Sequence, residues 1–298
     1  MPNPRVSMLM TLYNAEAFVV ETMESVLAQT FDDFEFVIVD DGSTDRSLAI
    51  VRRFQKQDPR VRILSRPNTG IVGALNDGLQ ACVGEYVARI DADDLCESER
   101  LSLQVARLDK APDLVALGCC AIAVDPKGRE LGAFDVPLSH EDIERNHLQG
   151  VSSIHHPAVM MRREAVNRAG GYREGFCPAE DYDLWLRLGE IGRLENLPQR
   201  LIRKRLTLSG IVASTLDRQR DVVKRALADA YERRGLADAP EPSLGEVRRT
   251  RDILQQWGWM ALQTGRVGAA RLYAVKSLVC SPWNLSSWRL AYCAMRGR

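Results

Sequence analysis

Short apolar runs alternate with segments of helical periodicity along the first hundred residues of this 298-residue chain. The apolar runs lie at residues 6–10, 36–39, 61–64 and 86–90. The segments between them repeat apolar residues every three or four positions, as in Phe18, Met23, Val26 and Leu27, in Leu48, Val51 and Phe54, and through 71–82. Strands that alternate with helices are typical of βαβ units. The pattern therefore predicts an α/β fold with a mostly parallel central sheet flanked by helices.

The pattern becomes less regular beyond residue 100. A helical segment over 101–108 precedes the apolar run 114–124, and a Pro- and Gly-containing stretch follows through Pro137. We expect this stretch to be irregular, because Pro and Gly interrupt regular elements.

The last quarter of the chain is expected to be helical. A helix is predicted over 214–234, and 235–242 has the composition of a linker. Ser243 and Glu246 have the spacing of a capping box, which marks the start of another helix. The sequence therefore predicts a main domain that ends near residue 235 and a C-terminal helical annex over 243–298.

Composition excludes several classes of protein. Forty basic and forty acidic residues cancel, so no overall field favours a nucleic acid as partner. The seven cysteines are odd in number and show no C-x-x-C spacing, which argues against a zinc site or a disulfide framework and indicates a reducing environment. We find neither a signal-peptide pattern nor a run of about eighteen apolar residues, so a cytoplasmic location is expected.

Acidic clusters follow two of the predicted strands. Asp40-Asp41-Gly42 ends one, and Asp91-Ala92-Asp93-Asp94 ends another. Ligands of open α/β sheets bind outside the carboxyl ends of the strands. A D-x-D segment there suits Mg²⁺ or Mn²⁺, which would be shared with substrate phosphates and would neutralise a leaving diphosphate. The alternative for such a short motif is a solvated acidic turn.

An ordered series of short motifs decides between these two interpretations. The series contains 6–14, 29–31, 37–45, 66–70, 74–78, 84–86, 89–94 and 100–101, and then 156–163, 171–172 and 180–187. In residue type and order it closely resembles the family 2 glycosyltransferases, a large group with the GT-A fold that builds bacterial polysaccharides and lipopolysaccharide. The resemblance covers roughly the first two-thirds of the chain and does not extend to the annex.

The resemblance implies a GT-A domain over 1–235, in which 1–105 bind a nucleotide sugar and 106–235 form the acceptor side. It implies a metal-dependent enzyme of the hexosyltransferase type. Such an enzyme would move a sugar from a nucleotide-diphosphate donor, expected to be a UDP-sugar, to a hydroxyl acceptor with inversion. The acceptor would be a growing cell-surface polysaccharide or a lipid-linked glycan.

Four residues are assigned to the donor by the resemblance. Thr11 and Tyr13 would line the nucleobase pocket, and Asp41 would accept a hydrogen bond from a uracil-like N–H, since an ionised carboxylate only accepts. Arg66 would donate hydrogen bonds from its guanidinium group to the diphosphate, or would be an exposed loop arginine.

The metal and the proton acceptor are assigned in the same way. Asp93 would be the principal metal ligand, and Asp91 would reach the metal through water or bind the donor's ribose. His156 would be a further ligand, or would shape the acceptor cleft. Asp181 would be the general base of an inverting reaction, with Glu180 orienting acceptor or sugar. The alternative for this pair is a set of helix-start acids that suit the helix dipole.

Three questions stay open at this stage. Arg203, Lys204 and Arg205 lie where the family often has an arginine-containing strand and a loop that closes over the donor diphosphate. The aromatic-arginine-histidine motif that is usual there is missing, and a solvated basic strand fits these residues equally well. The tryptophans and arginines of the annex suit an anionic membrane surface, a packing face or a homodimer contact. The rival functions are a catalytically degenerate scaffold, a helical module for partner binding, and a sugar nucleotidyltransferase. The last lacks its Gly-rich phosphate loop here.

Overall fold

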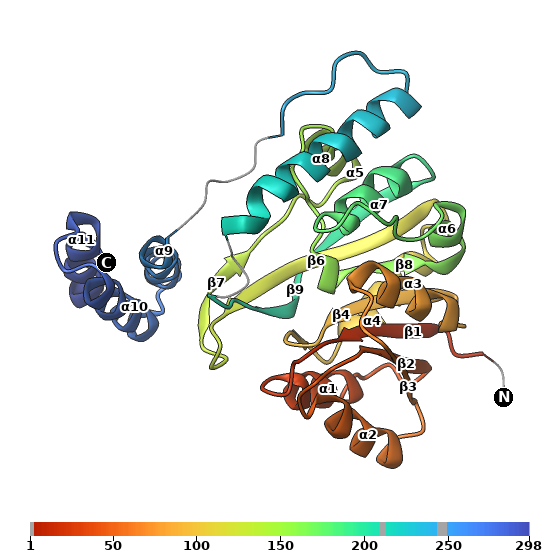
Figure 1. Cartoon of the computed structure of the whole chain (residues 1–298), viewed down its shortest axis with the longest axis horizontal. Helices are drawn as coiled ribbons and strands as arrows, with labels where there is room; N and C mark the ends of the chain where they lie inside the picture. Colours follow the sequence, from red (N-terminus) through yellow and green to blue (C-terminus); the bar gives the residue numbers. More distant parts are fainter. Residues whose placement is uncertain (1–2, 209–212, 243–248, 298) are drawn as a thin grey trace.

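A mixed sheet with helices on both faces forms the centre of the molecule (Figure 1). The computed structural model describes residues 3–208, 213–242 and 249–297, with backbone alone for 213–216. Within these residues the nine strands run in the order β3-β2-β1-β4-β8-β6-β9-β5, and β7 pairs with β6. The strands are β1 Val6–Leu12, β2 Phe34–Asp41, β3 Val61–Arg66, β4 Tyr86–Asp91, β5 Leu95–Cys96, β6 Leu114–Val124, β7 Glu130–Phe134, β8 Met160–Arg162 and β9 Arg193–Arg205. The helices are α1 Val19–Leu27, α2 Ser47–Gln57, α3 Ile71–Ala81, α4 Arg100–Asp109, α5 His140–His147, α6 Arg163–Arg168, α7 Glu180–Gly189, α8 Ala213–Arg233, α9 Thr250–Gln263, α10 Val267–Cys280 and α11 Leu285–Arg296, with a 3₁₀ turn at His156–Ala158.

The first half of the sheet is parallel. β1 lies between β2 and β4 and is parallel to both, and β3 is parallel to β2. Side chains alternate between the two faces, because successive residues of a strand point in opposite directions. Met8 and Met10 join the core beneath α1, α2 and α4, whereas Leu9 joins the core beneath α3 and α7. The predicted α/β fold is confirmed, and the carboxyl ends of β1, β2 and β4 meet at one edge.

The second half of the sheet is mixed. β8 is antiparallel to both β4 and β6, and β6 is parallel to β9. The expectation that the stretch before Pro137 is irregular is wrong, because β6 and β7 form an antiparallel hairpin there. The Asp125 carboxylate accepts from the backbone N–H groups of Lys127 and Arg129, and Gly128 takes a positive φ of 76°. Turn residues therefore close a hairpin here.

Helices α9, α10 and α11 form the predicted annex at the C-terminal end of the chain (blue in Figure 1). Their shared core includes Trp257, Tyr273 and Leu290, and it extends onto Leu131 of β7. The Tyr273 hydroxyl donates to Asp125 Oδ2 at 2.7 Å, which ties α10 to the β6–β7 hairpin. The expected capping box of Ser243 and Glu246 lies outside the described residues. Within the described part of the chain, we find no helix with the length and apolarity that crossing a bilayer requires.

Candidate active site

A cavity of about 430 Å³ opens where β1, β2 and β4 end. Its lining contains five of the residues predicted to bind donor or metal, namely Thr11, Tyr13, Asp41, Asp91 and Asp93. It also contains Asn14, Phe18, Asn68 and Ile71, which the sequence did not single out. Tyr13 lines this cavity and is 53% exposed.

The loop opposite β1 is held by Asp41. Its two carboxylate oxygens accept from the backbone N–H groups of Thr69, at 3.1 Å, and Gly70, at 2.9 Å. Arg66 lies behind this carboxylate, with Nε 3.3 Å from Asp41 Oδ1, and also pairs with Asp77. Arg66 is not among the residues that line the cavity. In this conformation it therefore supports Asp41.

Three aspartates converge at the end of β4. Oxygens of Asp91, Asp93 and Asp94 lie within 4.8 Å of one another, and this is a metal-compatible group among the described residues. Asp94 Oδ1 accepts from the backbone N–H of Arg205 at 2.7 Å, while its buried Oδ2 has no partner. Burial, and then the charge of Asp91, raises the pKa of Asp93. Burial, and then the charges of Asp91 and Asp93, raises the pKa of Asp94 well above its usual range. This concentration of negative charge is unfavourable without a cation.

Arg89 distinguishes Asp91 from its neighbours. Its Nη2 lies 2.7 Å from Asp91 Oδ1 and donates to Thr11 Oγ1 at 3.0 Å. Arg89 is 1% exposed, and its Nε and Nη1 are buried without a partner. Burial alone would raise the pKa of Asp91, but the positive charge of Arg89, together with that of Lys204, outweighs it and lowers the pKa. Arg89 therefore favours the ionised form of Asp91, whereas burial and neighbouring charges disfavour that form in Asp93 and Asp94.

A second cavity, of about 350 Å³, adjoins the first. Its lining includes His155, His156, Glu180, Asp181 and Lys204, together with Asp91. Asp91 thus lines both cavities. The structure brings the predicted proton acceptor to the cavity beside the predicted donor pocket, although ninety residues of sequence separate Asp181 from Asp91.

The acidic pair occupies the first turn of α7. Asp181 Oδ1 accepts from the backbone N–H of Tyr182 at 2.7 Å. Burial is the main cause of a raised pKa of Asp181, with a smaller contribution from Asp91. Burial, and then the neighbouring charge of Asp181, raises the pKa of Glu180 to about 7. A carboxylate with a raised pKa is a stronger proton acceptor than an ordinary one.

His156 is held by a chain of side chains from two other elements. Its Nε2 lies 2.7 Å from the Tyr172 hydroxyl, and Tyr172 exchanges backbone hydrogen bonds with the Asn76 amide. Gly171 has a φ of 66°, and a Cβ there would lie 2.8 Å from Asn76 Oδ1, so glycine fits this position. Burial, and then Arg89, lowers the pKa of His156 to about 3, so the imidazole is neutral. The compact group of carboxylates does not include His156.

The basic residues of β9 face different surroundings. Arg203 pairs with Glu97 and Glu130, while Arg205 pairs with Glu21 and donates from Nε to the backbone oxygen of Asp93 at 2.8 Å. Lys204, between them, lines the second cavity. Side chains alternate along a strand, and this alternation is the signal that could have separated Lys204 from its neighbours. Arg205 therefore supports the backbone of the acidic segment 91–94, and Arg203 links β9 to Glu97 and to Glu130 of β7.

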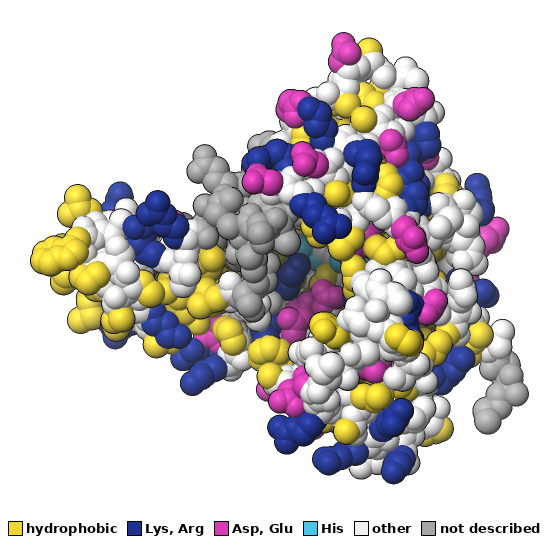
Figure 2. All heavy atoms as spheres, viewed as in Figure 1, with side chains coloured by type: hydrophobic (Ala, Val, Ile, Leu, Met, Phe, Trp, Pro, Cys, Tyr) yellow, Lys and Arg dark blue, Asp and Glu magenta, His cyan; other side chains and the backbone are white. Residues whose placement is uncertain are grey.

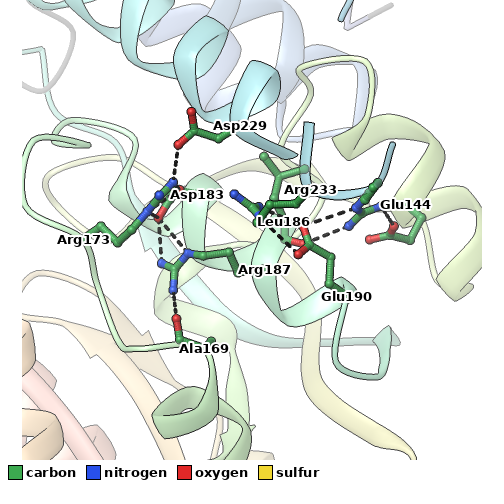
Figure 3. Close-up of polar contacts among 10 residues, drawn as sticks. Glu144, Ala169, Arg173, Asp183, Leu186, Arg187, Glu190, Asp229 and Arg233 are labelled. Atoms are coloured by element: carbon green, nitrogen blue, oxygen red, sulfur yellow. Dashed lines mark hydrogen bonds and ion pairs between the residues drawn. The ribbon is translucent and has the colours of Figure 1, made fainter. Parts of the chain in front are cut away.

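A buried ionic network fixes α7 in place (Figure 3). Asp183, which is fully buried, accepts from Arg173 and from Arg187. Arg173 also reaches Asp229 of α8, and Arg187 donates to the backbone oxygen of Ala169. The sequence motif 180–187 thus contains Glu180 and Asp181, which line the second cavity, and Asp183 and Arg187, which hold α7 in place.

Comparison with known proteins identifies the fold and the family. Residues 7–170 match the model described as glycosyl transferase family 2. The chain belongs to this family. It is 35% identical over 203 residues to the amylovoran biosynthesis glycosyltransferase AmsE of Erwinia amylovora, covering 67% of this chain and 75% of AmsE. It is 32% identical over 219 residues to an uncharacterized glycosyltransferase of Haemophilus influenzae, covering 68% of this chain and 66% of that protein.

Two solved structures share the fold of this chain. S. aureus TarS 1-349 in complex with UDP-GlcNAc superposes with a TM-score of 0.61 at 20% identity, covering 97% of this chain and 79% of the TarS 1-349 chain. The mannosyltransferase PcManGT from Pyrobaculum calidifontis in complex with GDP-Man and Mn²⁺ gives a TM-score of 0.60 at 18% identity, covering 99% of this chain and 87% of PcManGT. The protein is a family 2 glycosyltransferase with the GT-A fold.

Proposed function

We propose that this glycosyltransferase transfers a sugar from a nucleotide-diphosphate donor of the UDP type to a hydroxyl group, with inversion. The observation that carries the proposal is that Asp91 lines both the cavity at the ends of β1, β2 and β4 and the cavity that contains Asp181. A donor in the first cavity would therefore meet an acceptor in the second. The UDP-GlcNAc complex of TarS and the name of AmsE support a nucleotide-sugar donor and a role in bacterial polysaccharide or glycolipid synthesis.

The cluster at the end of β4 fits a divalent cation. Its oxygens are close together, and Asp94 contributes a buried oxygen without a partner. Carboxylate oxygens are the ligands that Mg²⁺ and Mn²⁺ prefer, and PcManGT was solved with Mn²⁺. Asp93 would be the principal ligand, with Asp91 beside it on the side of the second cavity. A bound cation would neutralise the departing diphosphate.

The chain's own groups would carry out the remaining steps. Asp41 and Tyr13 would bind the nucleobase in a pocket that Thr11 also lines. Thr11 Oγ1 accepts a hydrogen bond from Arg89, which pairs with Asp91. Asp181 would accept the proton of the acceptor hydroxyl at Oδ2, since Oδ1 accepts from the helix backbone. Glu180 would orient the acceptor by a hydrogen bond. Lys204, in the same cavity, would keep Asp181 ionised.

Thermal shift measurements test the donor site. The full chain would be heated with UDP, GDP, CDP or dTDP, each with and without Mn²⁺, since a ligand that binds the native state raises the melting temperature. UDP is expected to stabilise the protein only together with Mn²⁺. Asp93→Ala should abolish this stabilisation, and the charge-matched control Asp33→Ala, on an exposed loop, should retain it. Absence of stabilisation by every nucleotide would favour a degenerate scaffold.

The proton acceptor needs a separate experiment. Asp181→Asn should retain the metal-dependent stabilisation by UDP and lose sugar transfer, because it removes the base and leaves the donor cavity intact. Transfer would be followed as release of UDP from UDP-sugars. A variant that transfers at the wild-type rate would exclude Asp181 as the base. Formation of nucleotide sugar from a nucleoside triphosphate and a sugar phosphate would instead indicate a nucleotidyltransferase.

The division of the chain and its location are part of the same proposal. Residues 1–235 would form the catalytic domain, with the donor half over 1–105 and the acceptor half over 106–235, and 243–298 would form an annex. The enzyme would act in the cytoplasm, where nucleotide sugars are made. The acceptor would be a glycan or a lipid-linked sugar.

A further inference from the structure

The C-terminal part of the chain has an unusual charge distribution. Asp252 is the last acidic residue, and the 46 residues after it contain six basic residues and no acid, although the whole chain is neutral. The basic residues are Arg266, Arg271, Lys276, Arg289, Arg296 and Arg298. The positive charge of this segment is therefore offset by an excess of acids in the first 252 residues.

The same segment exposes large apolar side chains. Trp283 is 94% exposed, Leu285 84% and Val279 77%. On α11, Leu285, Trp288, Tyr292 and Met295 are spaced by three, four and three residues, so they form one stripe along the helix. Val275 and Val279 are spaced by four on α10. Figure 2 shows apolar side chains gathered over this end of the molecule, with basic side chains around them.

The exposed stripe is not the face on which the annex packs. The inward face of α11 contains Leu290 and Ala294, which are fully buried against α9 and α10. α11 is therefore apolar on two sides, of which the described chain covers one. Isolated apolar side chains are common on protein surfaces, but exposed apolar side chains gathered at one end of the molecule, on α10, α11 and the turn between them, mark an interaction surface.

We infer that this face of α10 and α11 docks on an anionic phospholipid surface. Lys276 and Arg289 are exposed, and neither forms an ion pair with a described carboxylate, so their charge can meet lipid phosphates. Lys276 Nζ lies 5.0 Å from the centroid of the Tyr273 ring, a contact that does not neutralise its charge. The indole N–H of Trp288 donates to the backbone oxygen of Pro282 at 2.7 Å, so this ring can enter an apolar layer without losing a hydrogen bond. Amphipathic helices with tryptophan on one face and Lys or Arg beside it bind in the bilayer interface in this manner.

Charge favours a lipid surface over a second copy of the chain. In a symmetric dimer the same face would meet itself, and both faces are positive without an acid to pair with. An anionic bilayer offers the complementary charge at every position. Docking requires neither donor nor acceptor, so its test is independent of the proposed sugar transfer.

Vesicle sedimentation with the full-length protein tests the inference. Vesicles of phosphatidylcholine alone would be compared with vesicles that contain about one third phosphatidylglycerol. Binding is expected only to the anionic vesicles and should weaken at high salt. The double variant Lys276→Gln/Arg289→Gln should bind roughly 30-fold more weakly, since each basic residue near the surface contributes about fivefold. The control Arg52→Gln/Arg53→Gln makes the same charge change on the exposed face of α2 and should bind like wild type.

A second variant tests the apolar contribution. Trp283→Ser/Leu285→Ser should bind about tenfold or more weakly, with an unchanged melting temperature because both side chains are exposed. Equal binding to neutral and anionic vesicles, or no binding to either, would overturn the inference. A dimer in light scattering that this variant converts to a monomer, without vesicle binding by wild type, would assign the face to self-association.

Discussion

Replacement of Asp183 by asparagine tests whether the network in Figure 3 holds α7. The substitution keeps the shape of the side chain and removes its charge. In the protein, this carboxylate accepts from Arg173 Nε at 3.1 Å and from Arg187 Nε and Nη2 at 3.0 and 2.6 Å. The asparagine would leave two guanidinium groups near a neutral amide, whose NH₂ group faces one of them.

The surroundings set the size of the effect. Removing one partner of a buried ion pair destabilises a protein by about 3–5 kcal/mol, because the other charge stays buried without compensation. The side chain of Arg187 is 9% exposed and retains only the Ala169 carbonyl, so it bears this cost. Arg173 is 34% exposed and keeps Asp229, so water and a second carboxylate compensate it. The expected loss in the free energy of unfolding is therefore near the lower end, about 3 kcal/mol.

Urea unfolding followed by circular dichroism measures this loss. Asp183→Asn should lower the transition midpoint without changing the slope. The matched control is Asp142→Asn, which removes an exposed carboxylate that pairs with Arg145 and accepts from the N-cap residue Ser139 on α5, and it should lower the midpoint by much less, equivalent to about 1 kcal/mol or below. A loss below about 1 kcal/mol for Asp183→Asn would refute the reasoning, since it would mean that the pair contributes no more than a surface ion pair.

Three further substitutions have defined outcomes. The positive charge of Lys204 lowers the pKa of Asp181, so Lys204→Gln should raise that pKa. The acid limb of the pH profile of kcat/KM for sugar transfer should then move to higher pH. An acid limb at the wild-type pH would contradict this role of Lys204. Burial lowers the pKa of His147 to about 3, so below about pH 6.5 the unfolded state binds more protons than the folded state. The free energy of unfolding should therefore fall by up to about 4 kcal/mol as the pH drops toward 3. His147→Gln should flatten this pH dependence, as measured by urea unfolding. Gly171→Ala should lower the melting temperature more than Gly170→Ala, because both have positive φ but only the Cβ at 171 meets an amide oxygen, at 2.8 Å; equal losses would exclude the contact as the cause.

Local sequence patterns were sufficient to predict the fold of residues 1–105. The alternation along β1 and the acids after β2 and β4 predicted an α/β sheet and a crevice at its carboxyl edge. The structure confirms both, and it places Thr11, Asp41 and Asp93 around one cavity. Proximity follows here from the parallel arrangement of neighbouring strands, which the βαβ pattern implies.

Contacts between segments far apart in the sequence could not be predicted from such local patterns. Alternation along β9 could separate Lys204 from Arg203 and Arg205, but it does not indicate that Lys204 shares a cavity with Asp91, because the register of β9 against β6 shifts at three points along the strand. Arg89 was part of a quoted motif, yet its burial beneath Asp91 depends on packing between β4 and its neighbours. The hairpin before Pro137 was missed because its turn depends on the Asp125 side chain rather than on residue composition alone.

The shared position of Asp91 has a thermodynamic consequence. Asp91 lines both cavities, so under the proposed function it would interact with an occupant on either side, and filling one cavity would change the binding free energy in the other. Linkage requires the effect to be reciprocal: if the donor tightens acceptor binding by some factor, the acceptor tightens donor binding by the same factor. The apparent affinity for either substrate is then a property of the pair, and affinities measured for one substrate alone will differ from those of the ternary complex.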